Sequence, residues 1–175
     1  MAFEGYALYP PLTVRDNIAF SLMREKISKE KVDSKVVEVS ELLEITDILE
    51  RYPPSISGGQ QQRVSLARAL VRDSDALLLD EPMSQLEPQL RAVLRARVKD
   101  YIQHNNKTVI FVTHSIEEAV YLADQVVILS GRPGSIADIV YPEIDRRGEI
   151  DLIRRQSRYM ELVDEIWSSL KRYVE

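Results

Sequence analysis

Apolar positions in the first part of the chain recur every three or four residues, which is the spacing of amphipathic helices. A first helix is predicted after Thr13, because Asp16 three residues on completes a helix-start signal. A second begins near Ser28, and Tyr52-Pro-Pro ends that region because proline removes a backbone donor. A third follows Ser57. The three apolar faces carry Val14, Ile18 and Leu22; Val32, Val36, Val39 and Leu43; and Val64, Ala67 and Val71.

The second half of the chain alternates short apolar runs with helical patterns. A helix with Pro88 at its first position separates the first two runs and ends at Asn105-Asn106. This order predicts an α/β fold with a mainly parallel sheet. The predicted strands are Ala76–Leu79, Thr108–Thr113 and Gln125–Ser130, with a peripheral strand at Ile136–Tyr141. After Gly148 an apolar stripe predicts a packed helix anchored by Trp167; the stripe is Met160, Val163, Trp167, Leu170 and Val174.

Charge and composition narrow the possible partners. The net charge of −5 argues against a nucleic-acid partner, since phosphate binding needs clustered Lys and Arg. The chain has no cysteine, so thiolate chemistry and disulfides are excluded. The longest apolar runs are strand-sized, far below the roughly 20 residues of a membrane-spanning helix. We therefore expect no transmembrane segment, and any link to a membrane would go through a partner protein.

Two carboxylates follow the first predicted strand. Asp80 and Glu81 come directly after Leu77–Leu79, and the carboxyl ends of parallel strands are where open α/β sheets bind ligands. One carboxylate there can hold Mg2+ through water, and its neighbour can polarise an attacking water molecule. The plainer alternative is a strand that ends in a polar turn.

Two further segments have the residues for phosphate contact. Ser57-Gly58-Gly59-Gln60 opens a helix, where free N–H groups and the helix dipole favour an anion. The alternative is an ordinary cap, although two glycines in a first turn cost stability. His114 follows a predicted strand and precedes a helix capped by Ser115, where a γ-phosphate contact would lie; a lone histidine by itself is more often structural.

These segments together resemble the ATP-binding subunit of ABC transporters. The resemblance implies a partial P-loop NTPase (RecA-like) core with a mainly parallel sheet plus the ABC helical subdomain, lacking the Walker A strand and the P-loop. It also implies four segments: a Q-loop remnant (1–11), the helical subdomain with the signature (12–72), the partial core (73–141) and a C-terminal helical tail (142–175). The matching motifs are the Q-loop region from Phe3 to Ile18, the signature Ser57–Gln60, the Walker B segment Leu77–Pro82, the D-loop Ser84–Glu87 and the switch histidine His114.

The resemblance also implies roles, with ATP and Mg2+ as the bound groups. Asp80 and Glu4 would lie at the Mg2+, Glu81 would be the catalytic base, and His114 would contact the γ-phosphate. The signature residues would act in trans, on the nucleotide of the opposite subunit. The residues of this trans contact are Ser57, Gly58, Gly59 and Gln60, and those of the D-loop are Ser84 and Glu87.

Three departures from the family pattern affect what we expect. No Gly-x-x-x-x-Gly-Lys-Ser/Thr occurs in the chain, so an ABC-type ATPase by family is expected to be inactive alone. Glu4 stands where the family has Gln, and Glu87 where the D-loop usually has Asp. The resemblance also implies that the P-loop strand lies between the strands at Thr108–Thr113 and Gln125–Ser130. Its loss would leave these two strands with unpaired edges or force them together.

The expected function is that of an ATP-binding subunit, or a fragment of one, in an ABC importer. The segment from Ala119 to Ser130 with Arg132-Pro133-Gly134 resembles importers of nitrate, sulfonates and taurine, which predicts a small anion as the solute. Expected partners are transmembrane permease subunits and a second ATP-binding subunit, at the cytoplasmic face of the membrane, or in the cytoplasm if unassembled. The alternative is a non-hydrolysing partner or truncated product that docks on a transporter and lends its signature in trans.

Overall fold

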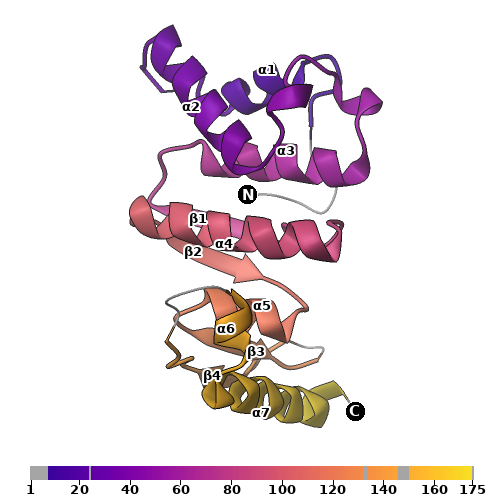
Figure 1. Cartoon of the computed structure of the whole chain (residues 1–175), viewed down its shortest axis with the longest axis vertical. Coiled ribbons are helices and arrows are strands. Elements are labelled where there is room, and N and C mark those ends of the chain that lie inside the picture. Colours follow the sequence, from indigo (N-terminus) through magenta and orange to yellow (C-terminus); the bar gives the residue numbers. More distant parts are fainter. Residues whose placement is uncertain (1–7, 24, 132–133, 146–149, 175) are drawn as a thin grey trace. The chain divides into compact units, whose positions relative to one another are not determined.

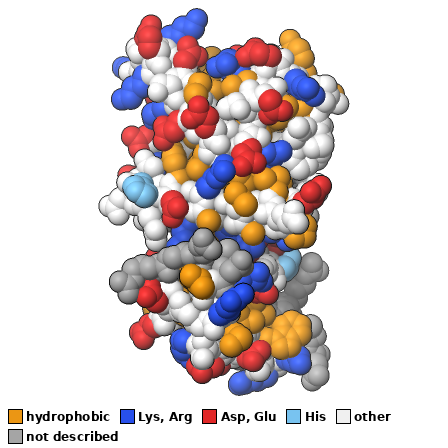
Figure 2. Space-filling view, viewed as in Figure 1, with side chains coloured by type: hydrophobic (Ala, Val, Ile, Leu, Met, Phe, Trp, Pro, Cys, Tyr) orange, Lys and Arg blue, Asp and Glu red, His pale blue; other side chains and the backbone are white. Residues whose placement is uncertain are grey.

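The chain forms two compact units, Met1–Val112 and Thr113–Glu175, each with its own hydrophobic core (Figure 1). The structure is a computed structural model that describes residues 8–23, 25–131, 134–145 and 150–174. Within those ranges no helix is both long enough and apolar enough to cross a bilayer. Figure 2 shows acidic and basic side chains interspersed over the visible face, with neither sign gathered into one large area.

The helices of the first unit begin where the sequence predicts. Thr13, Ser28 and Ser57 each accept a hydrogen bond from the backbone N–H three residues on, at 3.1, 3.3 and 3.2 Å. Such caps satisfy donors that the helix itself cannot pair. The described elements are α1 (Val14–Phe20), α2 (Lys29–Leu42), the 3-10 turns η1 (Thr46–Ile48) and η2 (Pro53–Ser55), α3 (Gly58–Leu70), β1 (Ala76–Asp80), α4 (Pro88–His104) and β2 (Thr108–Val112).

The three helices before β1 pack on one another through the apolar faces that the spacing predicts (Figure 1). Full burial of a side chain of this kind contributes about 1.5–3 kcal/mol. The core continues under β1 and α4, so the helical region and the strands of this unit share one hydrophobic interior. Its fully buried members include Val14, Ile18, Val36, Val64, Leu70, Leu79, Leu94 and Val98.

Strands β1 and β2 pair in parallel, with α4 as the crossover between them, which confirms the predicted parallel sheet. The register runs from Ala76 opposite Thr108 to Asp80 opposite Val112. One face of the pair packs on the core of this unit, and the other face is more exposed. Val109 and Phe111 pack on the core, whereas Ile110 on the other face is 60% exposed. Strand β2 is therefore apolar on both faces, as the sequence indicates, but only one of these faces packs on the core.

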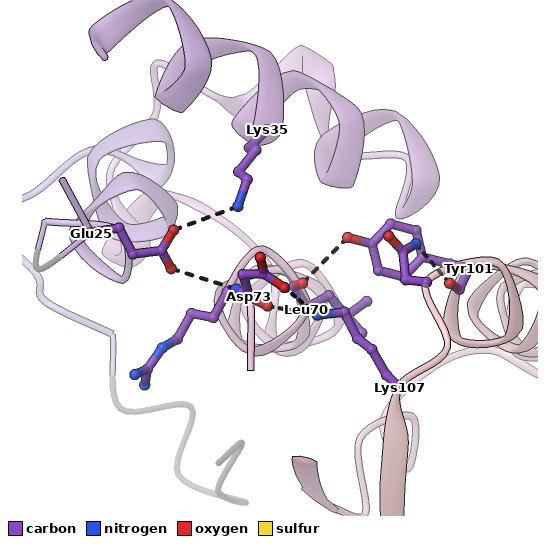
Figure 3. Close-up of polar contacts among 8 residues, drawn as sticks. Glu25, Lys35, Leu70, Asp73, Tyr101 and Lys107 are labelled. Carbon is purple, nitrogen blue, oxygen red and sulfur yellow. Dashed lines mark hydrogen bonds and ion pairs between the residues drawn. The ribbon is translucent and has the colours of Figure 1, made fainter. Parts of the chain in front are cut away.

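A polar cluster joins the helices of the first unit to the strand layer (Figure 3). Glu25, just after α1, pairs with Lys35 of α2 at 3.5 Å and accepts from the backbone N–H of Asp73 at 3.5 Å. Lys107, just before β2, donates to the carbonyl of Arg72 at 2.9 Å and lies 3.9 Å from the Asp73 carboxylate. The turn between α3 and β1 is thereby anchored from two sides.

Tyr101 of α4 should make the first unit sensitive to alkali. Its hydroxyl donates to the carbonyl of Leu70 at 3.4 Å, and burial, helped by the Glu38 and Asp73 carboxylates, raises the pKa of Tyr101 to about 12. The unfolded chain binds that proton with a pKa of about 10. The stabilisation is therefore complete below about pH 10 and is lost as the pH rises toward 12.

We expect Tyr101→Phe to remove one tyrosine of raised pKa from the tyrosinate absorbance titration and to flatten the loss of stability above about pH 10. Tyr52→Phe is the matched control, because Tyr52 is exposed. Denaturant unfolding at a series of alkaline pH values measures the effect. An alkaline stability curve that Tyr101→Phe leaves unchanged would contradict the assignment.

The second unit is a hairpin covered by helices (Figure 1). Strands β3 and β4 pair antiparallel, with Val126 opposite Val140, and Ser130 donates its backbone N–H to the carbonyl of Ser135 at 2.8 Å to close the connection. The peripheral strand that the sequence predicts is therefore the partner of β3. The described elements are α5 (Ile116–Leu122), β3 (Val126–Leu129), β4 (Ile136–Val140), α6 (Ile150–Arg154) and α7 (Ser157–Val174).

The C-terminal helix is present, but the predicted anchor is wrong. Trp167 is 53% exposed and lies under the ammonium of Lys171, 5.3 Å from its ring centroid. Helix α7 carries two apolar stripes one position apart. The fully buried stripe is not the predicted one, of which Val163 and Leu170 are partly buried against the core. Spacing alone could not choose between the two stripes. The buried residues of α7 are Tyr159, Leu162, Ile166 and Ser169.

Both described sheets have two strands, and β2 and β3 belong to different sheets. The strands on either side of the missing P-loop strand are therefore not forced together but keep unpaired edges. We expect native-state hydrogen exchange to protect α1, α2 and α3 more than residues 108–130. The helical amides bond locally, and one face of each helix packs into the buried core, whereas each described strand has one partner. Mass spectrometry of peptides spanning 12–72 and 108–130 measures this. Equal or reversed protection would mean that the sheet edges are covered in solution.

Candidate nucleotide-handling site

The first turn of α3 carries the four predicted signature residues. The Ser57 hydroxyl accepts from the N–H of Gln60 at 3.2 Å, and the Gln60 side chain accepts from the N–H of Ser57 at 2.9 Å, which completes the predicted capping box. Ser57 and Gly58 are exposed, and Gly59 and Gln60 are half-buried. Helix α3 has 13 residues, enough for its dipole to favour an anion at this end.

Gly59 is not required by the packing inside the chain. A Cβ added there would meet the carbonyl oxygen of Gln85 at 3.4 Å and the side chain of Leu86 at 3.6 Å, which is ordinary van der Waals contact. Both Gly58 and Gly59 lie within the helix, where glycine costs roughly 0.5–1 kcal/mol relative to alanine. Within the described residues, the packing around Gly59 therefore gives no reason for a glycine at this position of α3.

Asp80 and Glu81 lie at the carboxyl end of β1, as predicted. Asp80 is the last residue of the strand and is exposed. Glu81 has φ 46°, a left-handed conformation that side-chain-bearing residues rarely adopt. The other two such residues in the described ranges, Glu44 and Asn106, follow helix ends, where this conformation is common. Glu81 follows a strand, so it is the unusual one.

The strained residue is held by backbone contacts on both sides. Its N–H donates to the carbonyl of Val112 at the end of β2, at 3.0 Å, and its carbonyl accepts from the N–H of Ser84 at 3.3 Å and from the Ser84 hydroxyl at 3.2 Å. Backbone strain that surrounding structure over-determines is typical of functional sites. The conformation of Glu81 is thus fixed by β-strand register and by the turn after it.

The predicted D-loop, Ser84–Glu87, is the second half of the turn that leads from β1 into α4. Arg91 of α4 donates to the carbonyls of Ser84 and Leu86 at 2.8 and 2.9 Å. Glu87 occupies the N-cap of α4 without a side-chain cap bond and is exposed. An aspartate or serine would cap this helix better, so the carboxylate of Glu87 remains available to groups outside the helix.

Gln62 ties the signature helix to this turn, and the sequence did not single it out. Its side chain donates to the carbonyl of Glu81 at 2.9 Å and to the hydroxyl of Ser84 at 3.1 Å, and it accepts from the N–H of Gln85 at 3.0 Å. It is 5% exposed. The one available signal was its position on α3, four residues before buried Leu66 and hence on the core side of the helix.

His114 belongs to the second unit. It is exposed and sits in a tight turn between β2 and α5. The Thr113 hydroxyl donates to the buried Glu118 carboxylate at 2.8 Å and accepts from the N–H of Ser115 at 3.0 Å, while the Ser115 hydroxyl caps α5 by accepting from Glu118 N–H at 3.2 Å. The predicted cap of the helix after His114 is therefore confirmed.

The donor set fits Mg2+ only as a partial site. Mg2+ binds through one or two carboxylates, waters and substrate phosphates, and Asp80 supplies one exposed carboxylate at the strand end. Glu4 lies outside the described residues. Within the part of the chain that is described, no three acidic or histidine side chains gather closely enough to hold a metal by themselves. Asp80 could thus hold Mg2+ only together with a nucleotide.

The sequence is similar to known ATP-binding proteins. A family model described as "ABC transporter" matches residues 1–84. The multiple sugar-binding transport ATP-binding protein MsmK of Streptococcus mutans is 46% identical over 130 residues, which are 74% of this chain and 34% of that protein. The trehalose/maltose import ATP-binding protein MalK of Thermococcus litoralis is 45% identical over 130 residues, 74% of this chain and 35% of that protein.

A third relative and a solved structure extend the comparison. The sn-glycerol-3-phosphate import ATP-binding protein UgpC 1 of Rhizobium etli is 40% identical over 150 residues, 85% of this chain and 43% of that protein. The fold is similar to the dimeric post-hydrolysis structure of the ATP-binding cassette MJ0796 bound to ADP and Pi, with TM-score 0.73 and 27% identity, covering 81% of this chain and 62% of that one. The chain thus spans about a third of the length of the first relatives named.

Proposed function

We propose that this chain, which belongs with the ATP-binding domains of ABC transporters, acts as an ATP-binding subunit of an importer, or as part of one, and supplies the signature half of a composite ATP site. The observation that carries the proposal is the first turn of α3. It presents a capped helix end with Gly59 placed where the chain's own packing does not require a glycine. The free N–H groups of this helix end and the helix dipole would favour a phosphate group there.

The residues of β1 and the following turn would serve the chain's own nucleotide site. Asp80 would hold Mg2+ through water, and Glu81, fixed in its strained conformation, would orient and deprotonate the attacking water. His114 would contact the γ-phosphate, and Ser84 and Glu87 would face the second subunit. ATP bound with Mg2+ supplies the phosphoryl group whose release drives transport. With no Gly-rich phosphate loop in the chain, this second site needs a cradle from elsewhere.

The relatives change the solute that we propose. The expectation of nitrate, sulfonate or taurine is not supported by these matches, whose names refer to sugars and to sn-glycerol-3-phosphate. We therefore propose a polar carbohydrate-like solute in place of a small inorganic or sulfonate anion. The anion expectation depended on one stretch of sequence, from Ala119 to Ser130 with Arg132-Pro133-Gly134, and so short a stretch need not differ between transporters of different solutes.

We propose the assembly that the family implies: two ATP-binding subunits at the cytoplasmic face, docked on transmembrane permease subunits. The dimeric cassette to which the fold is similar supports the pairing. The alternative, a non-hydrolysing partner that lends its signature, makes the same use of Ser57–Gln60 but none of Glu81.

The test uses a partner subunit that has an intact phosphate loop but a disabled signature. Partner dimers cannot turn over because each site lacks a signature, and this chain alone lacks the loop. A mixture should hydrolyse ATP, because the partner's loop and this chain's Ser57–Gln60 complete one site. Phosphate release by the mixture, well above the sum of the separate proteins, supports the proposal. No release, although the two proteins co-elute with ATP, would refute it.

A further inference from the structure

The geometry points to Gln62 as a positioning residue that couples the signature segment to the turn carrying Glu81. This inference deepens the proposed function, because the signature and Glu81 would serve different nucleotide sites of one dimer. Gln62 lies in α3 less than two turns after Ser57, so it moves with the first turn of the helix. Its side-chain amide bonds Glu81, Ser84 and Gln85 in the turn after β1.

Only a glutamine-like group can make this set of contacts. The amide nitrogen donates to the Glu81 carbonyl and the Ser84 hydroxyl while the amide oxygen accepts from the Gln85 N–H. A carboxylate has no donor and an apolar side chain has neither function. At 5% exposure, water cannot easily replace these bonds.

The turn has a second anchor, which makes a coupling through Gln62 possible. Arg91 ties the turn to α4 at the carbonyls of Ser84 and Leu86. Gln62 ties the same turn to α3. A displacement of α3 relative to α4 would therefore strain the turn that Gln62 and Arg91 both hold. This turn begins at Glu81, whose backbone is already strained. Contact at the signature of one site would reach the water-activating residue of the other through three hydrogen bonds.

The test is a mutant cycle read by hydrogen exchange of the full chain, without nucleotide. Ser57→Ala removes the cap of α3 and should speed exchange of the Gln85 amide severalfold. Gln62→Leu should itself speed that exchange about tenfold, because the amide loses its acceptor. In the Gln62→Leu background, Ser57→Ala should then add nothing. The amide of Val98, in the buried middle of α4, reports global unfolding in every variant.

Gln61→Leu is the matched control. Gln61 is the neighbouring glutamine of α3, but its side chain bonds the carbonyls of Pro53 and Ile56 at 3.0 and 3.3 Å and not the turn after β1. In that background the response of Gln85 to Ser57→Ala should equal the wild-type response. Should Gln62→Leu fail to fold, Gln62→Met preserves the length of the side chain and tests the same point.

Two results would overturn the inference: no response of Gln85 to Ser57→Ala in the wild type, or a response of the same size after Gln62→Leu. Both are independent of ATP turnover. If the mixed dimer proves inactive while the cycle shows coupling, the proposed function fails and Gln62 remains a coupling residue. If the mixed dimer is active and the cycle shows none, only the role of Gln62 is lost.

Discussion

Ser57→Arg in this chain is expected to abolish ATP turnover by the mixed dimer, whereas Glu81→Gln is expected to leave it almost unchanged. The single complete site would contain the partner's phosphate loop and this chain's signature. An arginine at Ser57 would fill the space of the γ-phosphate and would also remove the cap of α3, worth about 1 kcal/mol. Glu81 would lie in the opposite site, which has no phosphate cradle and is idle. Steady-state phosphate release measures both variants.

Ser28→Arg is the control for the first variant. Ser28 caps α2 through the N–H of Lys31 as Ser57 caps α3 through Gln60, so the same substitution costs a similar helix cap without touching the signature. It should leave turnover intact. Loss of turnover in Glu81→Gln, with Ser28→Arg still active, would show that this chain runs a hydrolytic site of its own and would reject the one-site assembly.

The isolated chain is expected to bind ATP with Mg2+ at least a thousandfold more weakly than a subunit with its own phosphate loop. That loop contributes several backbone N–H bonds and a lysine contact, and charge-assisted bonds of this kind contribute roughly 1.5–3 kcal/mol each. Three such bonds at the lower figure amount to more than a thousandfold. This chain would supply only two of the groups that hold the nucleotide. Asp80 at the end of β1 is one carboxylate, and the signature at the start of α3 would contact the phosphates of ATP bound to a second subunit.

Isothermal titration calorimetry of the full chain, beside a complete relative under the same conditions, gives the comparison. Micromolar affinity in the isolated chain would contradict the prediction and would mean that a phosphate cradle forms without the Gly-rich motif.

Local chemistry in the sequence was enough to predict where elements begin. The bonds that start α1, α2 and α3 each join residues three apart, so Thr13, Ser28 and Ser57 specify them whatever the rest of the chain does. The strands β1 and β2 were predictable for a similar reason, since a β-branched or leucine run between turn signals is a local pattern. The position of Asp80 and Glu81 at a strand end followed directly.

The conformation of that strand end did not follow. Glu81 takes φ 46° because its N–H meets the carbonyl of Val112, more than thirty residues along the chain, and because the next turn folds back on its carbonyl. No pattern near Glu81 reports the register of β1 against β2. Gln62 was missed for the same reason. Gln62 is one of three consecutive glutamines. It differs from its neighbour Gln61 only in the distant segment that its side chain bonds.

By itself, the sequence determined the family, the helix caps, the strands and the order of the candidate site residues, because each depends on residues close together in the chain. Tertiary structure alone decided which apolar stripe of α7 is buried, leaving Trp167 exposed, and that β4 pairs with β3. It also decided that Gln62 joins α3 to the turn after β1. These outcomes depend on contacts between distant segments, whose competing arrangements have similar local patterns and differ only in how completely they bury surface and pair polar groups.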